Sequence, residues 1–248
     1  MCCFSRPVDL VKGTHIFARS SKAGRQFLVY SMILAAKEDL AMILPIPVPK
    51  NSKEDAVRFV NLEKYQDFFK DMDAGFPKPG NARGPSLGGA SGSKEDKKLQ
   101  LVDVGSYEAS FVPAIKDFDR LDERFRLPSG VWEKLPGYKE FGFVVFKLKK
   151  GQSNVHPMAF EFPRANPKKL FFPTVHIHDG KVHPTAGFDH ALYCQVSGDE
   201  NLEFKWRESP QPAGLFMKVQ QAQGLLDANG HCYLQELKGN LKNEDIYI

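Results

Sequence analysis

The sequence lacks the long apolar run that a membrane-spanning helix needs. Its longest apolar run, from Phe27 to Ala36, has about ten residues, whereas ~20 are needed to cross a bilayer. We therefore expect a buried strand there and no membrane partner. The chain also has little net charge, because 34 Lys and Arg stand against 30 Asp and Glu. Since these charges are interspersed and form no basic stripe, we expect no nucleic-acid partner.

Signals for export and for nucleotide binding are lacking as well. The first residues have no basic region followed by an apolar stretch and a small-residue cleavage site, which predicts a cytoplasmic location. In that compartment Cys2, Cys3, Cys194 and Cys232 are expected to be thiols. No phosphate-cradling glycine loop or dinucleotide fingerprint occurs in the sequence, so no nucleotide cofactor is predicted.

The patterns that are present favour β structure, with 20 Phe but only 2 Trp to fill the core. The segments His15–Arg19, Arg25–Ala35 and Leu40–Val48 alternate in polarity and predict three adjacent antiparallel strands. Pro45 and its neighbouring prolines cannot donate ladder hydrogen bonds, so we expect the third strand to leave the sheet or to lie at an edge. A helix is expected from Asn61 to about Met72.

Later segments repeat this mixture of strands and short helices. Helical stretches are expected near Asp117–Phe125 and Val131–Tyr138, and a strand is expected at Gly214–Val219. The predicted class is α+β, with mixed or mostly antiparallel β-sheets and a few helices packed on them. We divide the chain into an N-terminal sheet-plus-helix half (1–75), a flexible Gly/Pro/Ser-rich loop (76–98) and a second α+β half (99–248), which together form one integrated domain.

Several short segments resemble an uncharacterised bacterial family, a domain of unknown function with a cysteine-containing N-terminal strand. The resemblance is carried by Cys2-Cys3-Phe4 with Pro7-Val8, Leu44–Pro47, Val104–Glu108, Phe143–Leu148, and His156-Pro157 leading to Phe171–Pro173. Members of that family are usually exported and have no assigned activity. This sequence departs from them by lacking an export signal and by its histidine-rich segment. The resemblance implies that the chain folds as a single unit and implies no reaction.

The segment from His176 to His183 is the strongest candidate for chemistry. Asp179-Gly180 is typical of a two-residue hairpin turn, which would place His176 directly across from His183. Side chains alternate along a strand, so His178 would share their face. Three imidazoles on one face, with opposed β carbons ~5 Å apart, could converge on one ion. The alternative is that these are ordinary solvent-facing strand residues.

A fourth histidine could complete this site. His190 is expected on a nearby strand, and Asp179 or Asp189 could hold an imidazole tautomer through a hydrogen bond. Imidazole ligands favour copper, zinc, iron or nickel over calcium and magnesium. We therefore predict a transition-metal cofactor (copper, zinc or iron), held by His176, His178, His183, His190 and Cys2.

Cys2 is the candidate catalytic residue. Removal of Met1 would leave the Cys2 thiol beside a free α-amine, the arrangement of an N-terminal nucleophile. Its thiolate could instead join the histidines at the metal. Two structural interpretations stay open, namely a strand whose cysteines are simply buried, and lipid acylation of the Cys2-Cys3 pair.

The leading functional hypothesis from the sequence is a metal-dependent enzyme acting on a small-molecule or peptide substrate. Oxidoreductase chemistry is favoured over metal-assisted hydrolysis. The first alternative is a hydrolase that uses Cys2 as its nucleophile. The second is a non-enzymatic metal-binding or structural protein.

Overall fold

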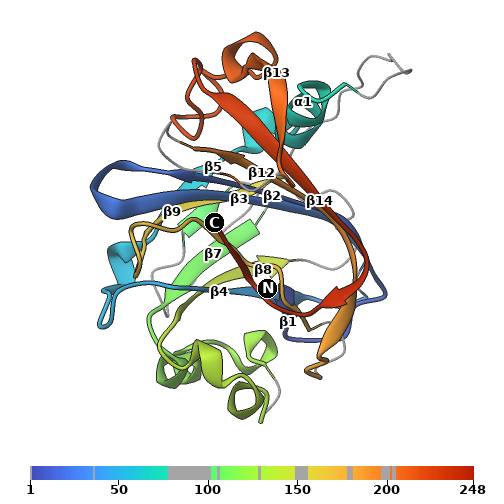
Figure 1. Cartoon of the computed structure of the whole chain (residues 1–248). Coiled ribbons are helices and arrows are strands. Elements are labelled where there is room, and N and C mark those ends of the chain that lie inside the picture. Colours follow the sequence, from blue (N-terminus) through green and yellow to red (C-terminus); the bar gives the residue numbers. More distant parts are fainter. Residues whose placement is uncertain are drawn as a thin grey trace.

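Two large β-sheets packed face to face form the centre of the protein (Figure 1). The computed structural model describes residues 2–35, 37–77, 102–104, 107–127, 130–148, 156–177, 181–196, 202 and 205–248. The larger sheet has seven strands in the order β13-β14-β12-β2-β3-β9-β5. Their bounds are β2 (Leu10–Ser20), β3 (Arg25–Ala35), β5 (Arg58–Asn61), β9 (Met158–Pro163), β12 (Thr185–Gln195), β13 (Arg207–Pro212) and β14 (His231–Lys242).

The second sheet has six strands in the order β11-β1-β4-β8-β7-β6. It consists of β1 (Cys2–Phe4), β4 (Leu40–Ile46), β6 (Val102–Val104), β7 (Tyr107–Val112), β8 (Gly142–Leu148) and β11 (His176–Ile177). A third sheet is a short pair, β10 (Phe171–Phe172) with β15 (Ile246–Tyr247). Both large sheets are mixed, since β12 runs parallel to β2 and β11 runs parallel to β1.

Helical structure is sparse in the described part of the chain. It contains one α-helix, α1 (Phe68–Ala74), and short 3₁₀ helices. The 3₁₀ helices are η1 (Lys22–Gly24), η2 (Glu54–Ala56), η3 (Glu63–Tyr65), η4 (Ile115–Arg120), η5 (Glu123–Phe125), η6 (Trp132–Lys134), η7 (Pro136–Tyr138) and η8 (Ala213–Leu215).

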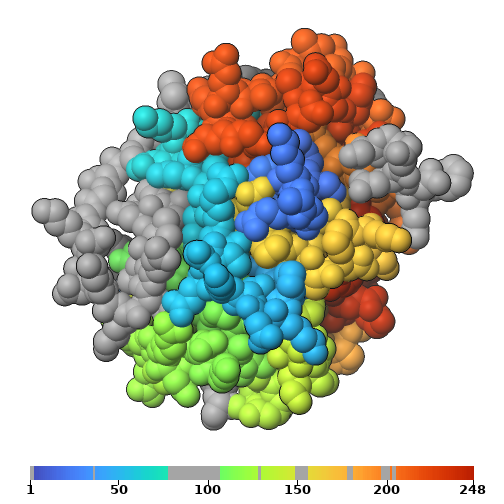
Figure 2. All heavy atoms as spheres, turned by 90° about the vertical axis from the view of Figure 1, so that its left-hand side faces the viewer, coloured from blue at the N-terminus to red at the C-terminus, as the bar shows by residue number. Residues whose placement is uncertain are grey.

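The elements form four layers, namely the two large sheets and one outer layer on each, and three apolar clusters pack between them. The largest lies between the two sheets and takes Tyr30 from β3 and Phe146 from β8. A second covers the outer face of the seven-stranded sheet with α1 and the segment 213–226. A third covers the outer face of the six-stranded sheet with the turns of residues 115–138. In Figure 2 these outer layers form the orange upper end and the green lower end of the molecule.

The predicted α+β class is wrong, because the protein is mostly β. The helices expected at 117–125 and 131–138 are short 3₁₀ segments of three to six residues, too short to bury an amphipathic helical face. The strand expected at 214–219 is a series of turns that begins with η8. Strand β3, by contrast, has the expected bounds.

The expectation that Leu40–Val48 would pair beside Arg25–Ala35 is also wrong. Strand β4 instead lies inside the six-stranded sheet, between β1 and β8. It tolerates Pro45 because β1 pairs with it only at Met42 and Ile43, so the proline lies beyond the end of β1. The two halves of the chain are interleaved, since both sheets take strands from before and after residues 78–101.

No helix in the described ranges is long and apolar enough to span a membrane. The expected cytoplasmic location goes further than this finding.

Gly142 tests the close packing between β8 and its neighbours. A Cβ atom there would lie 2.5 Å from the Phe111 ring and 2.9 Å from the Val48 side chain. We expect Gly142→Ala to lower the free energy of unfolding by about 1–3 kcal/mol, the usual cost of overpacking a core. Gly137→Ala is the control, because a Cβ at Gly137 meets nothing within 4 Å. Urea denaturation of both variants checks the prediction, and equal midpoints would contradict it.

Candidate functional site

The C-terminal segment holds β11 in place. The Asn243 side chain accepts a hydrogen bond from the His176 backbone N–H at 2.7 Å and donates one to the His176 carbonyl at 3.0 Å. The Asp245 carboxylate accepts hydrogen bonds from the backbone N–H groups of Thr174 and Val175, at 2.8 and 3.0 Å. Tyr138 donates to the same carboxylate at 2.6 Å. These contacts fix the backbone at His176 against the N-terminal strand.

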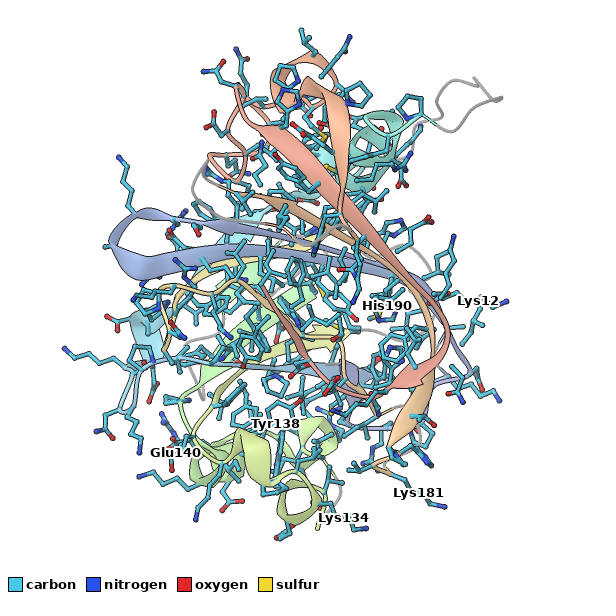
Figure 3. All side chains as sticks on the ribbon, in the orientation of Figure 1. Lys12, Lys134, Tyr138, Glu140, Lys181 and His190 are labelled. Atoms are coloured by element: carbon cyan, nitrogen blue, oxygen red, sulfur yellow. The ribbon has the colours of Figure 1, made fainter. Side chains whose placement is uncertain are left out.

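His176 meets His190 in the interior. Their Nε2 atoms lie 2.9 Å apart, and the two side chains belong to residues that are 9% and 2% exposed. The Phe188 ring contacts both imidazoles, with centroid distances of 4.6 and 5.1 Å. A hydrogen bond between two Nε2 atoms requires a proton on one and a lone pair on the other, so at least one of these imidazoles is neutral. Figure 3 labels His190, on the right-hand side of that view.

The other predicted site residues do not join this pair in the described structure. His178 lies outside the described residues, as does the expected Asp179-Gly180 turn. His183 is exposed, and its carbonyl accepts a hydrogen bond from Asn243 at 2.9 Å. The backbone of Cys2 pairs with His176 in the sheet, but its side chain is not among those described. Residues 181–184 form no strand, and β11 pairs with β1.

The three cysteine side chains that the structure describes are buried and form no disulfide: Cys3, Cys194 and Cys232. Burial raises the pKa of Cys232 to about 12, so this thiol stays protonated near neutral pH.

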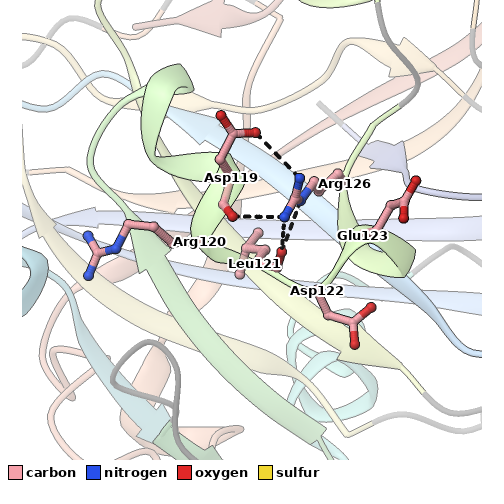
Figure 4. Close-up of a pocket in the computed structure, with 6 residues that line it drawn as sticks. All are labelled: Asp119, Arg120, Leu121, Asp122, Glu123 and Arg126. Atoms are coloured by element: carbon pink, nitrogen blue, oxygen red, sulfur yellow. Dashed lines mark hydrogen bonds and ion pairs between the residues drawn. The ribbon is translucent and has the colours of Figure 1, made fainter.

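The shallow pocket in Figure 4 has a volume of about 510 Å³ and lies over η4 and η5. Arg126, one of the residues that line it, donates to the carbonyls of Asp119 at 2.8 Å and Leu121 at 2.6 Å. Asp122 pairs with Arg124 at 3.0 Å. These charged groups stabilise the turns that form the pocket, and they give no arrangement of acid, base and nucleophile.

A cluster of polar side chains at the end of α1 was not predicted from the sequence. The helix packs Phe68, Phe69 and Met72 into the core, which leaves Asp73 at its exposed C-terminal end. The Tyr193 hydroxyl donates a hydrogen bond to one carboxylate oxygen of Asp73. His15 Nε2 lies 3.5 Å from the other oxygen. We call these three residues the Asp73 cluster.

Burial sets the electrostatics of the Asp73 cluster. Tyr193 has no exposed surface, and burial, followed by the negative charge of Asp73, raises the pKa of Tyr193. Its hydroxyl therefore remains a donor. His15 Nδ1 lies 2.8 Å from the Gly13 carbonyl, which can only accept, so Nδ1 carries the proton in the neutral ring. The sequence signal was Asp73-Ala74-Gly75, an aspartate followed by two small residues next to a predicted helix end.

Comparison with solved structures supplies a likeness for the whole fold. The fold resembles that of baculovirus P35. A crystal structure of a mutated baculovirus P35 after caspase cleavage aligns with a TM-score of 0.50 and 14% identity, over 95% of this chain and 98% of that one. Baculovirus P35 itself aligns at 0.49 and 14% identity, over 99% and 98%. The caspase-8/P35 complex aligns at 0.45 and 13%, over 95% of each chain.

No family model and no curated protein matches the chain. The resemblance to a bacterial family therefore stays a prediction. The fold likeness to P35 covers nearly all of both chains, including the strands on either side of residues 78–101.

These findings correct the functional hypothesis. The described residues contain no group of three or more His, Cys, Asp or Glu side chains that could hold a metal ion. His176 and His190 meet as a pair, whereas the segment that carries His183 does not pair with β11. The metal-dependent function, and with it the copper, zinc and oxidoreductase assignment, is therefore wrong.

The predicted small-molecule or peptide substrate needs correction as well. The solved structure that aligns at a TM-score of 0.50 is a P35 after caspase cleavage, so the partner named there is a protein. The Cys2 hydrolase, the first alternative to the metalloenzyme, gains no support from these structures.

Asn243 tests how the C-terminal segment positions His176. Its side chain makes three hydrogen bonds, two to the backbone of His176 and one to that of His183. We expect Asn243→Ala to lower the free energy of unfolding by about 2 kcal/mol, since buried backbone groups lose their partners. Asn240 is exposed and supplies the matched control. Asn240→Ala should lower the free energy of unfolding by less than about 0.5 kcal/mol. Denaturant titration of both variants decides, and equal losses would contradict the expected role of Asn243.

Proposed function

We propose that this chain is a protein ligand of a caspase-type cysteine protease, which it engages as a substrate-like inhibitor. The observation that carries the proposal is the likeness of the whole fold to a P35 described after caspase cleavage. The partner is then a protein, and the chain needs no metal or catalytic group of its own. With its buried thiols, the chain suits the cytoplasm, where we propose that it meets the protease.

The architecture supports this function because a protease ligand must present a segment from a rigid base. Here both faces of the seven-stranded sheet are covered by apolar clusters, and α1 lies on its outer face. The end of α1 is therefore an exposed point on a well-packed base (Figure 1).

Asp73 is the residue that we propose for the specificity pocket of the protease. Caspases cut the peptide bond that follows an aspartate, whose carboxylate is read by cationic side chains. The side chain of Asp73 is 52% exposed, and the next two residues, Ala74 and Gly75, are small enough to enter a narrow cleft.

Two other exposed aspartates precede an alanine, but at each site a backbone carbonyl is hydrogen-bonded to a side chain from a distant part of the sequence. The Asp227 carbonyl accepts hydrogen bonds from the Gln195 side chain at 2.8 Å and from the Gly230 N–H at 3.3 Å. Asp55 lies in η2, where the Ala56 carbonyl accepts from Arg25 at 2.8 Å. Asp73 differs from both because it ends a helix and is followed by a second small residue.

Incubation with a panel of caspases tests the proposal. We expect at least one caspase to release a fragment whose N-terminal residue is Ala74, and to lose activity on a reporter peptide in the same mixture. Asp73→Ala should lower cleavage by about 10⁴-fold, because a pocket built for a polar group rejects a residue that lacks it. N-terminal sequencing and reporter kinetics provide the two measurements.

Asp227→Ala is the control, and its cleavage should match that of the unsubstituted chain. Absence of both fragment and inhibition with every caspase would contradict the proposed function. A cut before Lys97, after Asp96, would contradict the choice of Asp73 while leaving the protease-ligand function intact.

A further inference from the structure

The Asp73 side chain is already engaged within the protein, although it is exposed. A protease pocket that reads an aspartate needs both carboxylate oxygens. In the structure one oxygen accepts from the Tyr193 hydroxyl, and the other faces His15 Nε2 at 3.5 Å. Asp73 must leave both groups before a protease can bind it.

Breaking the hydrogen bond between Tyr193 and Asp73 costs free energy. Tyr193 lies on β12 with no exposed surface, packed against Phe69 and Phe76 at ring distances of 6.0 and 5.7 Å. A buried hydroxyl that loses its acceptor carries a desolvation penalty. Burial raises the pKa of Tyr193, so its hydroxyl stays protonated near neutral pH and remains a donor to Asp73.

His15 adds a contact that depends on protonation. Its Nδ1–H donates to the Gly13 carbonyl, so Nε2 gains a proton only when the ring becomes positively charged. That proton would lie between Nε2 and the Asp73 carboxylate. The imidazole ring packs against the aromatic rings of Phe69 and Tyr193, at centroid distances of 5.3 and 6.2 Å.

The charged groups around His15 are few in the described structure. Asp73 approaches it from α1 and Tyr193 from β12, while Asp189 of β12 accepts from the Gly13 N–H at 2.7 Å. Glu236 and Arg207 act on Tyr193 from β14 and β13. Asp73 is the carboxylate that lies within ion-pair distance of the imidazole.

The backbone after Asp73 is fixed by turn hydrogen bonds and by close side-chain packing. The N–H groups of Gly75 and Phe76 donate to the carbonyls of Met72 and Asp73 at 3.1 and 3.0 Å. Gly75 is packed so closely on Phe216 that a Cβ would lie 2.4 Å from its ring. The Arg207 guanidinium lies over the Phe76 ring at 5.4 Å. A protease needs an extended substrate, so this closed turn must open before the bond after Asp73 can be cut.

From these contacts we infer that Tyr193 and His15 are positioning residues that keep the Asp73 carboxylate bound within the protein at the end of α1. We call this bound arrangement the closed state, and its opening sets the rate at which a protease gains access to Asp73. This inference rests on the proposed function for the choice of Asp73 as the cleaved residue. The closed state itself is a property of the protein alone, so it can be measured without any protease.

The decisive variant is Tyr193→Phe, which removes one hydroxyl and keeps the ring. We expect hydrogen exchange at the Gly75 and Phe76 amides to accelerate about tenfold, and caspase cleavage after Asp73 to accelerate by a similar factor. Tyr138→Phe is the matched control, because Tyr138 is also a buried tyrosine that donates to an aspartate, Asp245, at 2.6 Å. It lies in the lower outer layer, away from α1 at the top (Figures 1 and 3). It should leave both rates unchanged.

His15→Gln supplies a pH profile that a purely structural role would not alter. As the pH falls, the unsubstituted chain should be cleaved progressively more slowly than His15→Gln. The reason is that a protonated imidazole holds Asp73 more tightly than a neutral one. The ratio of the two rates at each pH removes the pH dependence of the protease itself.

The outcomes separate the two proposals. Unchanged exchange and unchanged cleavage in Tyr193→Phe, with a constant rate ratio for His15→Gln, would overturn the inference. Faster exchange in Tyr193→Phe with no caspase cleavage of any variant would support the closed state and overturn the proposed function. If Tyr193→Phe does not fold, the exchange rates and pH profile of His15→Gln decide the question alone.

Discussion

The packing of the two large sheets against each other is the interaction on which the rest of the structure depends. Alternate residues of β3 and β8 face the apolar layer between the sheets, represented by Tyr30 and Phe146. The residues between them face outward, where Val29 and Val145 meet the second and third clusters. Because both faces of each sheet are covered, the central strands are apolar along nearly their whole length.

Each outer layer follows from this need to cover a sheet. α1 and the segment 213–226 cover one sheet, and the turns between residues 115 and 138 cover the other. The exposed end of α1 therefore lies on a base that is fixed from below by aromatic side chains. The Asp73 cluster forms because β12 and β2 run side by side beneath the helix, which brings Tyr193 and His15 to the same carboxylate.

The sequence predicted local features better than the way in which they assemble. Strand β3 and the buried positions Leu62, Tyr65 and Phe68 follow from polarity patterns, which depend on which side of one element is covered. Strand β13 was missed because its segment, with Pro210 and Pro212, has weak strand propensity and pairs irregularly with β14. The histidine hairpin was expected from a turn motif, yet β11 pairs with the N-terminal strand instead.

By itself, the sequence determined which segments are apolar enough to form strands and which histidines and cysteines are candidates for a functional site. The sequence already grouped His176 with His190 in one candidate site, but only the tertiary structure decided that these two meet directly, and that Tyr193 meets Asp73 across 120 residues of chain. The physical reason is that residue spacing fixes the face of an element to which a side chain belongs, but the element that covers that face is selected by the packing of the whole core.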